Sequence, residues 1–371
     1  MTLKTLSLRG FRNYENLSAS LVPGVNLIVG DNAQGKTNLL EAVAYLSTGR
    51  SFRTRREQEL ILRGADFADL EAVVRTRERE QTARAVLFPG RKPRQLYLGG
   101  VKQKTAAEFT ALFRTVLFCP DDLLTLKAGA AARRKQMDAA LCQLRPGYDR
   151  ALREYGRLHD HKSRILRSRW EEPALLDTLP EFNLRMAQVG AALIYYRARY
   201  LRRLGELAAG FHGEFSGGRE RLALQYQTVS SVEDPLAPQE ILLERLREHQ
   251  ERHARAELEC AQCLSGPHKD DFDLTLDGVS LKSYGSQGQI RTAAISLKLG
   301  EREIFRKDAG EEPVLLLDDV LSELDPGRQD FILNRIQEGQ VFITCCEKGR
   351  LTELGQVLTI QGGALVPSVL H

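Results

Sequence analysis

The sequence of 371 residues predicts an α/β fold with a second, helical lobe, and three observations carry that expectation. Two short runs rich in aliphatic residues, at 25–29 and 314–317, are typical of buried strands, and the second ends in paired carboxylates. Alternating residues in the first hundred positions indicate antiparallel hairpins, and helical periodicity fills the middle of the chain. We expect residues 1–119 and 267–371 to form one lobe and residues 120–266 to form the helical lobe.

The composition is that of an ordinary folded protein, with 42% hydrophobic residues, 27% charged residues and a net charge of +4. No apolar run approaches the roughly 18 residues that a membrane helix needs. The alternating N-terminus suits a strand rather than a signal peptide. We therefore expect a cytoplasmic protein without a membrane partner. Of the six cysteines only Cys260 and Cys263 have metal-like spacing, so we predict neither zinc nor a structural disulfide.

A glycine-rich loop follows the first aliphatic run and precedes a run with helical spacing. Its pattern, G-x-x-x-x-G-K-[ST], presents backbone N–H groups and a helix N-terminus to phosphates. We predict that Lys36 reaches the β- and γ-phosphates of ATP and that Thr37 coordinates Mg²⁺. A chance loop before a helix is the alternative, and the flanking strand and helix disfavour it. The predicted nucleotide-binding residues are Gly30, Asp31, Asn32, Ala33, Gln34, Gly35, Lys36, Thr37 and Asn38.

The second aliphatic run ends in the paired carboxylates of Asp318 and Asp319. After a phosphate-binding loop, such a strand end is a Walker B element. Asp318 is predicted to hold Mg²⁺ through its water shell, and Asp319 to orient or deprotonate the attacking water. Lys36 and Asp319 are therefore the predicted catalytic residues. Two aspartates that merely cap a strand end are the alternative.

Two further stretches resemble motifs of ABC-type ATPases. The residues Ser286, Gln287, Gly288 and Gln289, at the start of a predicted helix, resemble the signature motif. Leu321–Asp325 resembles the D-loop, with Ser322 and Asp325. The order of these motifs is that of an ABC/SMC-type head. In that fold the phosphate loop of one subunit faces the signature serine of another, so the resemblance implies an ATP-dependent homodimer.

Five stretches, spread over nearly the whole chain, are similar to motifs of the RecF family of bacterial recombination mediators. The resemblance implies ATP-dependent binding to double-stranded and gapped DNA, with weak, DNA-stimulated ATP hydrolysis used as a switch. It also implies cooperation with RecR and RecO in loading RecA on single-stranded DNA during repair. The stretches are Leu8–Tyr14, Gly30–Glu41, Phe118–Leu123, Gly266–Asp271 and Leu317–Asp325.

Departures from the usual motifs and the length of the central segment disfavour two alternative functions. Asp319 stands where transporter ATPases usually carry Glu, and Thr344-Cys345-Cys346 lacks their switch histidine, which disfavours a transporter subunit and fast hydrolysis. About 150 central residues are too few for the long coiled coil of a structural SMC-like DNA tether, because a helix rises only about 1.5 Å per residue. Ala33 also replaces a glycine that is common in the phosphate loop.

The sequence leaves the role of several charged residues open. Arg9 and Arg12 could fold over the nucleotide or form a solvated edge, and the arginines at 50–56 could serve nucleotide, DNA or neither. Between Ala131 and Gly210 there are 16 Lys or Arg against 9 Asp or Glu, which suits a solvated face or contact with DNA phosphates. His268 is interpreted as a turn residue with a satisfied hydrogen bond. The resemblance to the family motif also allows a role near the nucleotide or a dimer interface, so no role is assigned to it.

Overall fold

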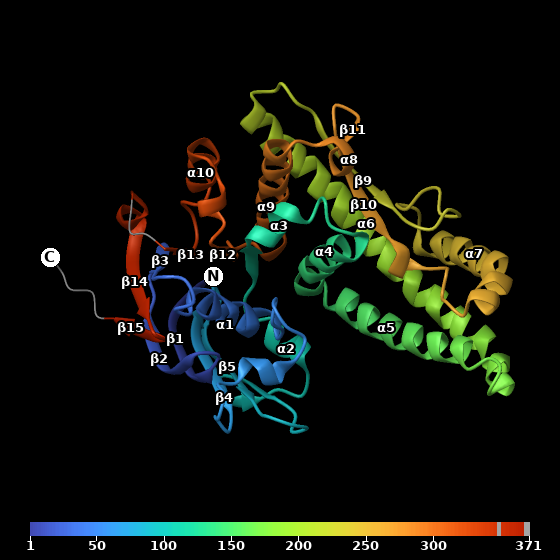
Figure 1. Cartoon of the computed structure of the whole chain (residues 1–371), viewed down its shortest axis with the longest axis horizontal. Helices are drawn as coiled ribbons and strands as arrows, with labels where there is room; N and C mark the ends of the chain where they lie inside the picture. The colour runs from blue at the N-terminus through green and yellow to red at the C-terminus, as the bar shows by residue number, and fades with distance from the viewer. Residues whose placement is uncertain (347–349, 367–371) are drawn as a thin grey trace. The chain divides into compact units, whose positions relative to one another are not determined.

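The computed structural model describes residues 1–346 and 350–366 and contains two compact units (Figure 1). One unit combines both ends of the chain, Met1–Leu123 and Glu301–His371, and is called the ATPase unit below. The other, the helical unit, comprises Leu124–Gly300. Among the described residues, no helix is both long enough and apolar enough to cross a membrane.

The ATPase unit contains a six-stranded, mainly parallel sheet in the order β15-β14-β3-β13-β12-β8. Its central strand β3 lies between β13 and β14 and runs parallel to both, although more than 300 residues separate them along the chain. Only β15 runs antiparallel to its neighbour. The strands are β3 (Val25–Val29), β8 (Thr115–Phe118), β12 (Val314–Asp318), β13 (Val341–Cys345), β14 (Gly355–Gln361) and β15 (Ala364–Val366).

A second, antiparallel sheet in the order β2-β1-β4-β5-β6-β7 completes the core of this unit. Helix α1 (Lys36–Thr48) contacts both sheets, and ten of its 13 residues are buried. The side chain of Gln340 also joins the sheets, because it accepts from Leu3 N at 2.7 Å and donates to Val22 O at 2.8 Å. The strands are β1 (Thr2–Phe11), β2 (Tyr14–Ser20), β4 (Ala68–Arg75), β5 (Glu80–Leu87), β6 (Gln95–Leu98) and β7 (Val101–Lys102).

The helical unit is built on α6 (Leu179–Ser216), whose apolar residues Val189, Leu193, Tyr200 and Leu204 are buried. In Figure 1 helices α5 and α7 run beside α6, and both contact it. A three-stranded sheet, in the order β11-β10-β9, packs on α6 through β9. The further elements are α4 (Ala130–Leu144), α5 (Pro146–Arg167), β9 (Leu222–Gln227), α7 (Gln239–Cys260), β10 (Asp271–Leu276), β11 (Val279–Ser280), α8 (Leu281–Tyr284) and α9 (Gln287–Ala309).

The boundary between the units differs from the predicted one. Residues 267–300 belong to the helical unit and not to the ATPase unit. The reason is strand pairing, because β10 pairs along its whole length with β9, which lies in the middle of the chain. The boundary therefore falls inside α9, at Gly300.

Three further short helices are α2 (Ala106–Thr110), α3 (Pro120–Leu124) and α10 (Pro326–Leu333).

A buried ionic network lies at the centre of the helical unit. Arg197 of α6 is 2% exposed and donates to Asp270 Oδ2 at 2.7 Å and to Asp138 Oδ1 at 2.9 Å. Asp270 is fully buried and also accepts from Thr228 Oγ1 at 2.7 Å and from the Tyr226 hydroxyl. Burial raises the pKa of Asp270, while Arg197 opposes that shift. The Arg197 guanidinium therefore connects α6 with α4 and with the loop that carries Asp270, and through Asp270 with strand β9.

Replacing Arg197 by Met should lower the free energy of unfolding by about 3–5 kcal/mol, because it leaves the Asp270 carboxylate buried without a countercharge. Urea unfolding followed by far-ultraviolet circular dichroism measures the change. The double variant Arg197→Met with Asp270→Asn is the control and should recover part of the loss. A single variant as stable as the parent would show that the network does not hold the unit together.

Candidate nucleotide-binding site

The glycine-rich loop joins the carboxyl end of β3 to α1 and needs its glycine at Gly35. The φ of Gly35 is 118°, and a Cβ there would lie 2.7 Å from Asn13 Nδ2. Ala33 has a φ of 64°, in the left-handed region that costs an L-residue roughly 1–2 kcal/mol. The conformation explains why a glycine is common at the position of Ala33, and shows that alanine still adopts it.

Lys36, the first residue of α1, places its ammonium group inside this loop. Its Nζ donates to Gly30 O at 2.5 Å and to Asp31 O at 3.0 Å, and lies 3.3 Å from Cys346 Sγ. All three hydrogens of the ammonium group therefore have partners, and the residue is only 7% exposed. A cation held inside a glycine-rich loop at a helix N-terminus is suited to bind phosphate.

Asp318 meets the loop because β3 and β12 flank β13, which brings the carboxyl ends of the three strands to one edge of the sheet. There the Thr37 hydroxyl donates to Asp318 Oδ1 at 2.9 Å. The Thr344 hydroxyl of β13 donates to the same oxygen at 3.0 Å. The predicted partners Thr37 and Asp318 are thus adjacent, and Thr344 was not foreseen.

The environment of Asp318 suits a cation. Burial raises the pKa of Asp318, whereas the hydrogen bonds from Thr37 and Thr344 lower it, and the nearby charge of Asp319 raises it further. Carboxylate and hydroxyl oxygens are the hard ligands that Mg²⁺ prefers, so Thr37 and Asp318 could hold this ion. When bound, Mg²⁺ would supply positive charge to phosphate oxygens.

The residues after Asp318 make a sharp turn. Asp319 has a left-handed φ of 52°, and its N–H donates to Thr344 Oγ1 at 2.8 Å. Ser322 Oγ donates to Asp319 O at 2.7 Å and so fixes the predicted D-loop to the same turn. Asp325 caps α10 by accepting from Arg328 N at 3.2 Å, and the Arg328 guanidinium lowers the pKa of Asp325.

A second layer of polar residues supports the loop. Tyr14 donates through its hydroxyl to Gly35 O at 2.8 Å, and Asn13 Nδ2 donates to Gln34 O at 2.8 Å. The turn between β14 and β15 adds a contact, since Gly363 N donates to Gln34 O at 3.2 Å. Asn13 and Tyr14 belong to the N-terminal stretch of the family resemblance, which signalled their importance without indicating these contacts.

Glu41 settles the position of two arginines whose roles the sequence left open. This fully buried carboxylate of α1 forms two hydrogen bonds with Arg12, at 2.7 and 2.8 Å. Arg12 therefore pairs with helix α1 and is not part of a solvated edge. Arg53 lies 3.4 Å from Glu41, donates to Asn38 Oδ1 at 2.7 Å and remains 44% exposed on its side chain. Glu41 ends the stretch Gly30–Glu41 of the family resemblance, but no feature of the sequence indicated these contacts.

The predicted signature residues lie in the helical unit, not in the ATPase unit. Ser286 Oγ accepts from Gln289 N at 3.2 Å, and Gln289 Oε1 accepts from Ser286 N at 3.1 Å, which forms a capping box at the start of α9. Gln289 Nε2 also donates to Glu220 Oε1 at 3.1 Å. Glu220 Oε2 lies 3.0 Å from Nε2 of the buried His212. Glu220 and His212 thus orient the predicted signature residues. Sequence reasoning missed both, because they lie far from residues 286–289 along the chain.

His268 is a turn residue with satisfied hydrogen bonds, as predicted. Its Nδ1 accepts from the Tyr155 hydroxyl at 2.8 Å and its Nε2 donates to Cys263 O at 3.0 Å. Burial lowers the pKa of His268 to about 4, so the ring is neutral at neutral pH. Each nitrogen is engaged within the helical unit.

Comparisons with known proteins agree with this geometry. Residues 2–363 match the family described as RecF/RecN/SMC N terminal domain. The DNA replication and repair protein RecF of Agathobacter rectalis is 38% identical over 346 residues, covering 93% of this chain and 92% of the relative. The protein of that name from Symbiobacterium thermophilum is 39% identical over 350 residues, covering 94% and 92%.

Solved structures give the same result. The recombination mediator protein RecF-ATPrS of the RecFOR pathway matches with a TM-score of 0.91 and 33% identity, covering 98% of this chain and 97% of the other. RecF-ATP matches with a TM-score of 0.90. A Pyrococcus furiosus Smc head, 15% identical with a TM-score of 0.57, shares the fold alone. The predicted ABC/SMC-type α/β head is confirmed, and the chain belongs to the RecF family of DNA replication and repair proteins.

Proposed function

We propose that this chain is an ATP-driven switch that binds double-stranded DNA near gaps and helps RecR and RecO load RecA on single-stranded DNA. The observation that carries the proposal is the contact between Thr37 and Asp318, which joins the phosphate loop to the Walker B strand. Hydrolysis is slow and stimulated by DNA, and Mg²⁺ accompanies ATP. The relatives named RecF and the solved ATP complex support this proposal.

In this proposal ATP holds two copies of the chain together. The phosphate loop and the signature lie in different units, and the signature serine of one copy completes the site of the other. Lys36 and the N–H groups of residues 30–37 bind the phosphates. Asp319 orients and deprotonates the attacking water, and its left-handed backbone, fixed through Thr344, keeps its carboxylate at the strand end. Dimerisation is thus the signal, and hydrolysis ends it.

Lys36→Ala should weaken ATP binding by about 10²–10⁴, because it removes two charge-assisted hydrogen bonds worth roughly 1.5–3 kcal/mol each. Titration of the protein with a fluorescent ATP analogue measures the affinity. Lys4→Ala is the matched control, since Lys4 is half-exposed in the same unit and pairs with Glu80. Parent-like affinity of the Lys36 variant would contradict the assignment of the loop.

Asp319→Asn should keep binding of ATP with Mg²⁺ but lower the rate of hydrolysis by about 10²–10⁴, because an amide cannot accept the proton of water. Asp318→Asn should instead weaken the dependence of ATP binding on Mg²⁺. Its amide oxygen can still accept from Thr37 and Thr344, so the fold remains intact. Single-turnover phosphate release and Mg²⁺ titrations distinguish the two effects. Parent rates in both variants would overturn the Walker B assignment.

Ser286→Arg should bind ATP as the parent does but stay monomeric, and lose ATP-strengthened DNA binding and hydrolysis together. A long side chain overfills an interface that packs at interior density. Analytical ultracentrifugation with and without ATP gives the oligomeric state. Ser230→Arg, the same change at an exposed position of the same unit, should dimerise normally. If the Ser286 variant also dimerises, the signature does not complete the site.

A further inference from the structure

One stretch of the ATPase unit carries an uninterrupted positive charge. Between Glu80 and Glu108 there are 27 residues without a single carboxylate. No other run of the ATPase unit without a carboxylate is as long. Six Lys or Arg lie in it: Arg84, Arg91, Lys92, Arg94, Lys102 and Lys104.

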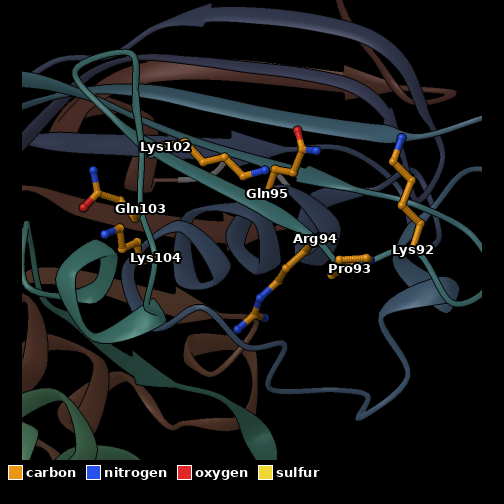
Figure 2. Close-up of a pocket in the computed structure, with 7 residues that line it drawn as sticks. All are labelled: Lys92, Pro93, Arg94, Gln95, Lys102, Gln103 and Lys104. Atoms are coloured by element: carbon orange, nitrogen blue, oxygen red, sulfur yellow. The ribbon is translucent and has the colours of Figure 1, made fainter.

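The fold gathers four of these cations around one hollow. Strand β6 turns at Gly99 and Gly100 into β7, so the segment after β7 returns beside the segment before β6. The two segments line a hollow of about 640 Å³ (Figure 2). The lining residues are Lys92, Pro93, Arg94, Gln95, Lys102, Gln103 and Lys104, and none is acidic.

The three lysines of the hollow are uncompensated. Within the described residues, none of Lys92, Lys102 and Lys104 has a carboxylate oxygen within 4.0 Å, and all three are exposed. The Lys92 ammonium lies 3.6 Å from the centroid of the Phe88 ring, which holds it without neutralising it. The positive potential of the hollow is therefore available to a ligand from solvent.

Arg94 forms the floor and connects the hollow to the phosphate-loop helix. Its guanidinium donates to Tyr45 OH at 2.9 Å and to Gly49 O at 2.6 Å, and it pairs with Glu57. In Figure 2 its side chain points from the hollow toward the helices, away from Lys92 and Lys102. Arg94 is thus structural, and it anchors the rim of lysines on the last turn of α1.

We infer that this hollow, the lysine hollow, binds the backbone phosphates of double-stranded DNA. The inference rests on the proposed function and names a surface for it. Three unpaired ammonium groups without an acidic neighbour complement consecutive phosphates, and the amides of Gln95 and Gln103 can donate to phosphate oxygens. Contacts of this kind carry no base sequence information, so binding through the lysine hollow is indifferent to sequence.

Lysines on an edge strand also discourage pairing with other sheets, and β7 is an edge. That role accounts for Lys102 alone. It does not account for Lys92 and Lys104, which lie outside the strands, nor for the absence of carboxylates from the lining. The convergence of two segments on one hollow therefore favours a phosphate ligand.

The test compares the parent with Lys102→Gln/Lys104→Gln in the full chain with ATP, by fluorescence anisotropy of a labelled DNA duplex at several salt concentrations. We expect affinity to fall on the order of tenfold, and the slope of log K against log[salt] to become shallower by about 2, close to 0.9 for each lost phosphate contact. Affinity for a fluorescent ATP analogue should not change, because the variant leaves Lys36 and its loop intact.

The control is Arg77→Gln/Arg79→Gln, which removes the same charge from the exposed turn between β4 and β5 of the same sheet. It should retain parent affinity and slope. If both variants lose the same DNA affinity, the effect comes from the net charge of the protein and not from the lysine hollow, and the inference is overturned. Unchanged DNA binding in the lysine variant would overturn it as well. Failure of the parent itself to bind DNA would overturn the proposed function.

Two further arms identify the source of the phosphate. Inorganic triphosphate should not displace the duplex at concentrations that leave ATP binding intact, whereas unlabelled duplex should. If triphosphate displaces the duplex from the parent, and Lys102→Gln/Lys104→Gln no longer binds triphosphate at the hollow, then the lysine hollow is a site for a small polyphosphate. That result would overturn the DNA assignment. A loss of RecR binding with DNA binding intact would assign it to a protein and overturn it equally.

Discussion

The structure of the ATPase unit depends on one carboxylate oxygen. Asp318 Oδ1 accepts hydrogen bonds from Thr37, at the start of α1, and from Thr344, in β13. A buried carboxylate is costly unless it is paired or hydrogen-bonded, and here two hydroxyls take the place of water. The same Thr344 hydroxyl accepts from the backbone of Asp319 and so fixes the turn that follows. Three parts of the chain are thus held in register at the edge where the phosphate loop begins.

Local sequence was sufficient for the parts of this site whose chemistry is local. The loop from Gly30 to Thr37 and the strand ending at Asp318 carry their own signals, because the spacing of glycines and the run of aliphatic residues are contained in a few positions. The contacts of Thr344, Glu41 and Glu220 carry no such local signal. Their roles arise from parallel pairing and from side-chain contacts between segments far apart, which a residue pattern does not encode. Glu41 reads as an ordinary polar position of a helix until Arg12 is known to reach it.

The unit boundary illustrates the same limit. The strand at Asp271–Leu276 was recognised by its alternation, but its partner β9 lies among helices and is only six residues long. Because pairing with β9 is antiparallel and complete, it places the predicted signature residues in the helical unit, where Glu220 and His212 orient them. The sequence predicted that both ends of the chain form one lobe and that the middle forms another. The assignment of residues 267–300 depended on knowing that β10 pairs with β9.

The central strand of the nucleotide site has an unusual history during synthesis. β3 leaves the ribosome early, but its two neighbours, β13 and β14, begin at Val341 and Gly355. At roughly 5–20 residues per second, the phosphate loop waits on the order of tens of seconds for the strands that flank it. Throughout that interval the backbone N–H and C=O groups along both edges of β3 are unpaired, and most of its side chains are aliphatic. An unpaired strand of this kind is able to pair with another chain. Newly made chains of this protein should therefore depend on chaperones until the last strands emerge.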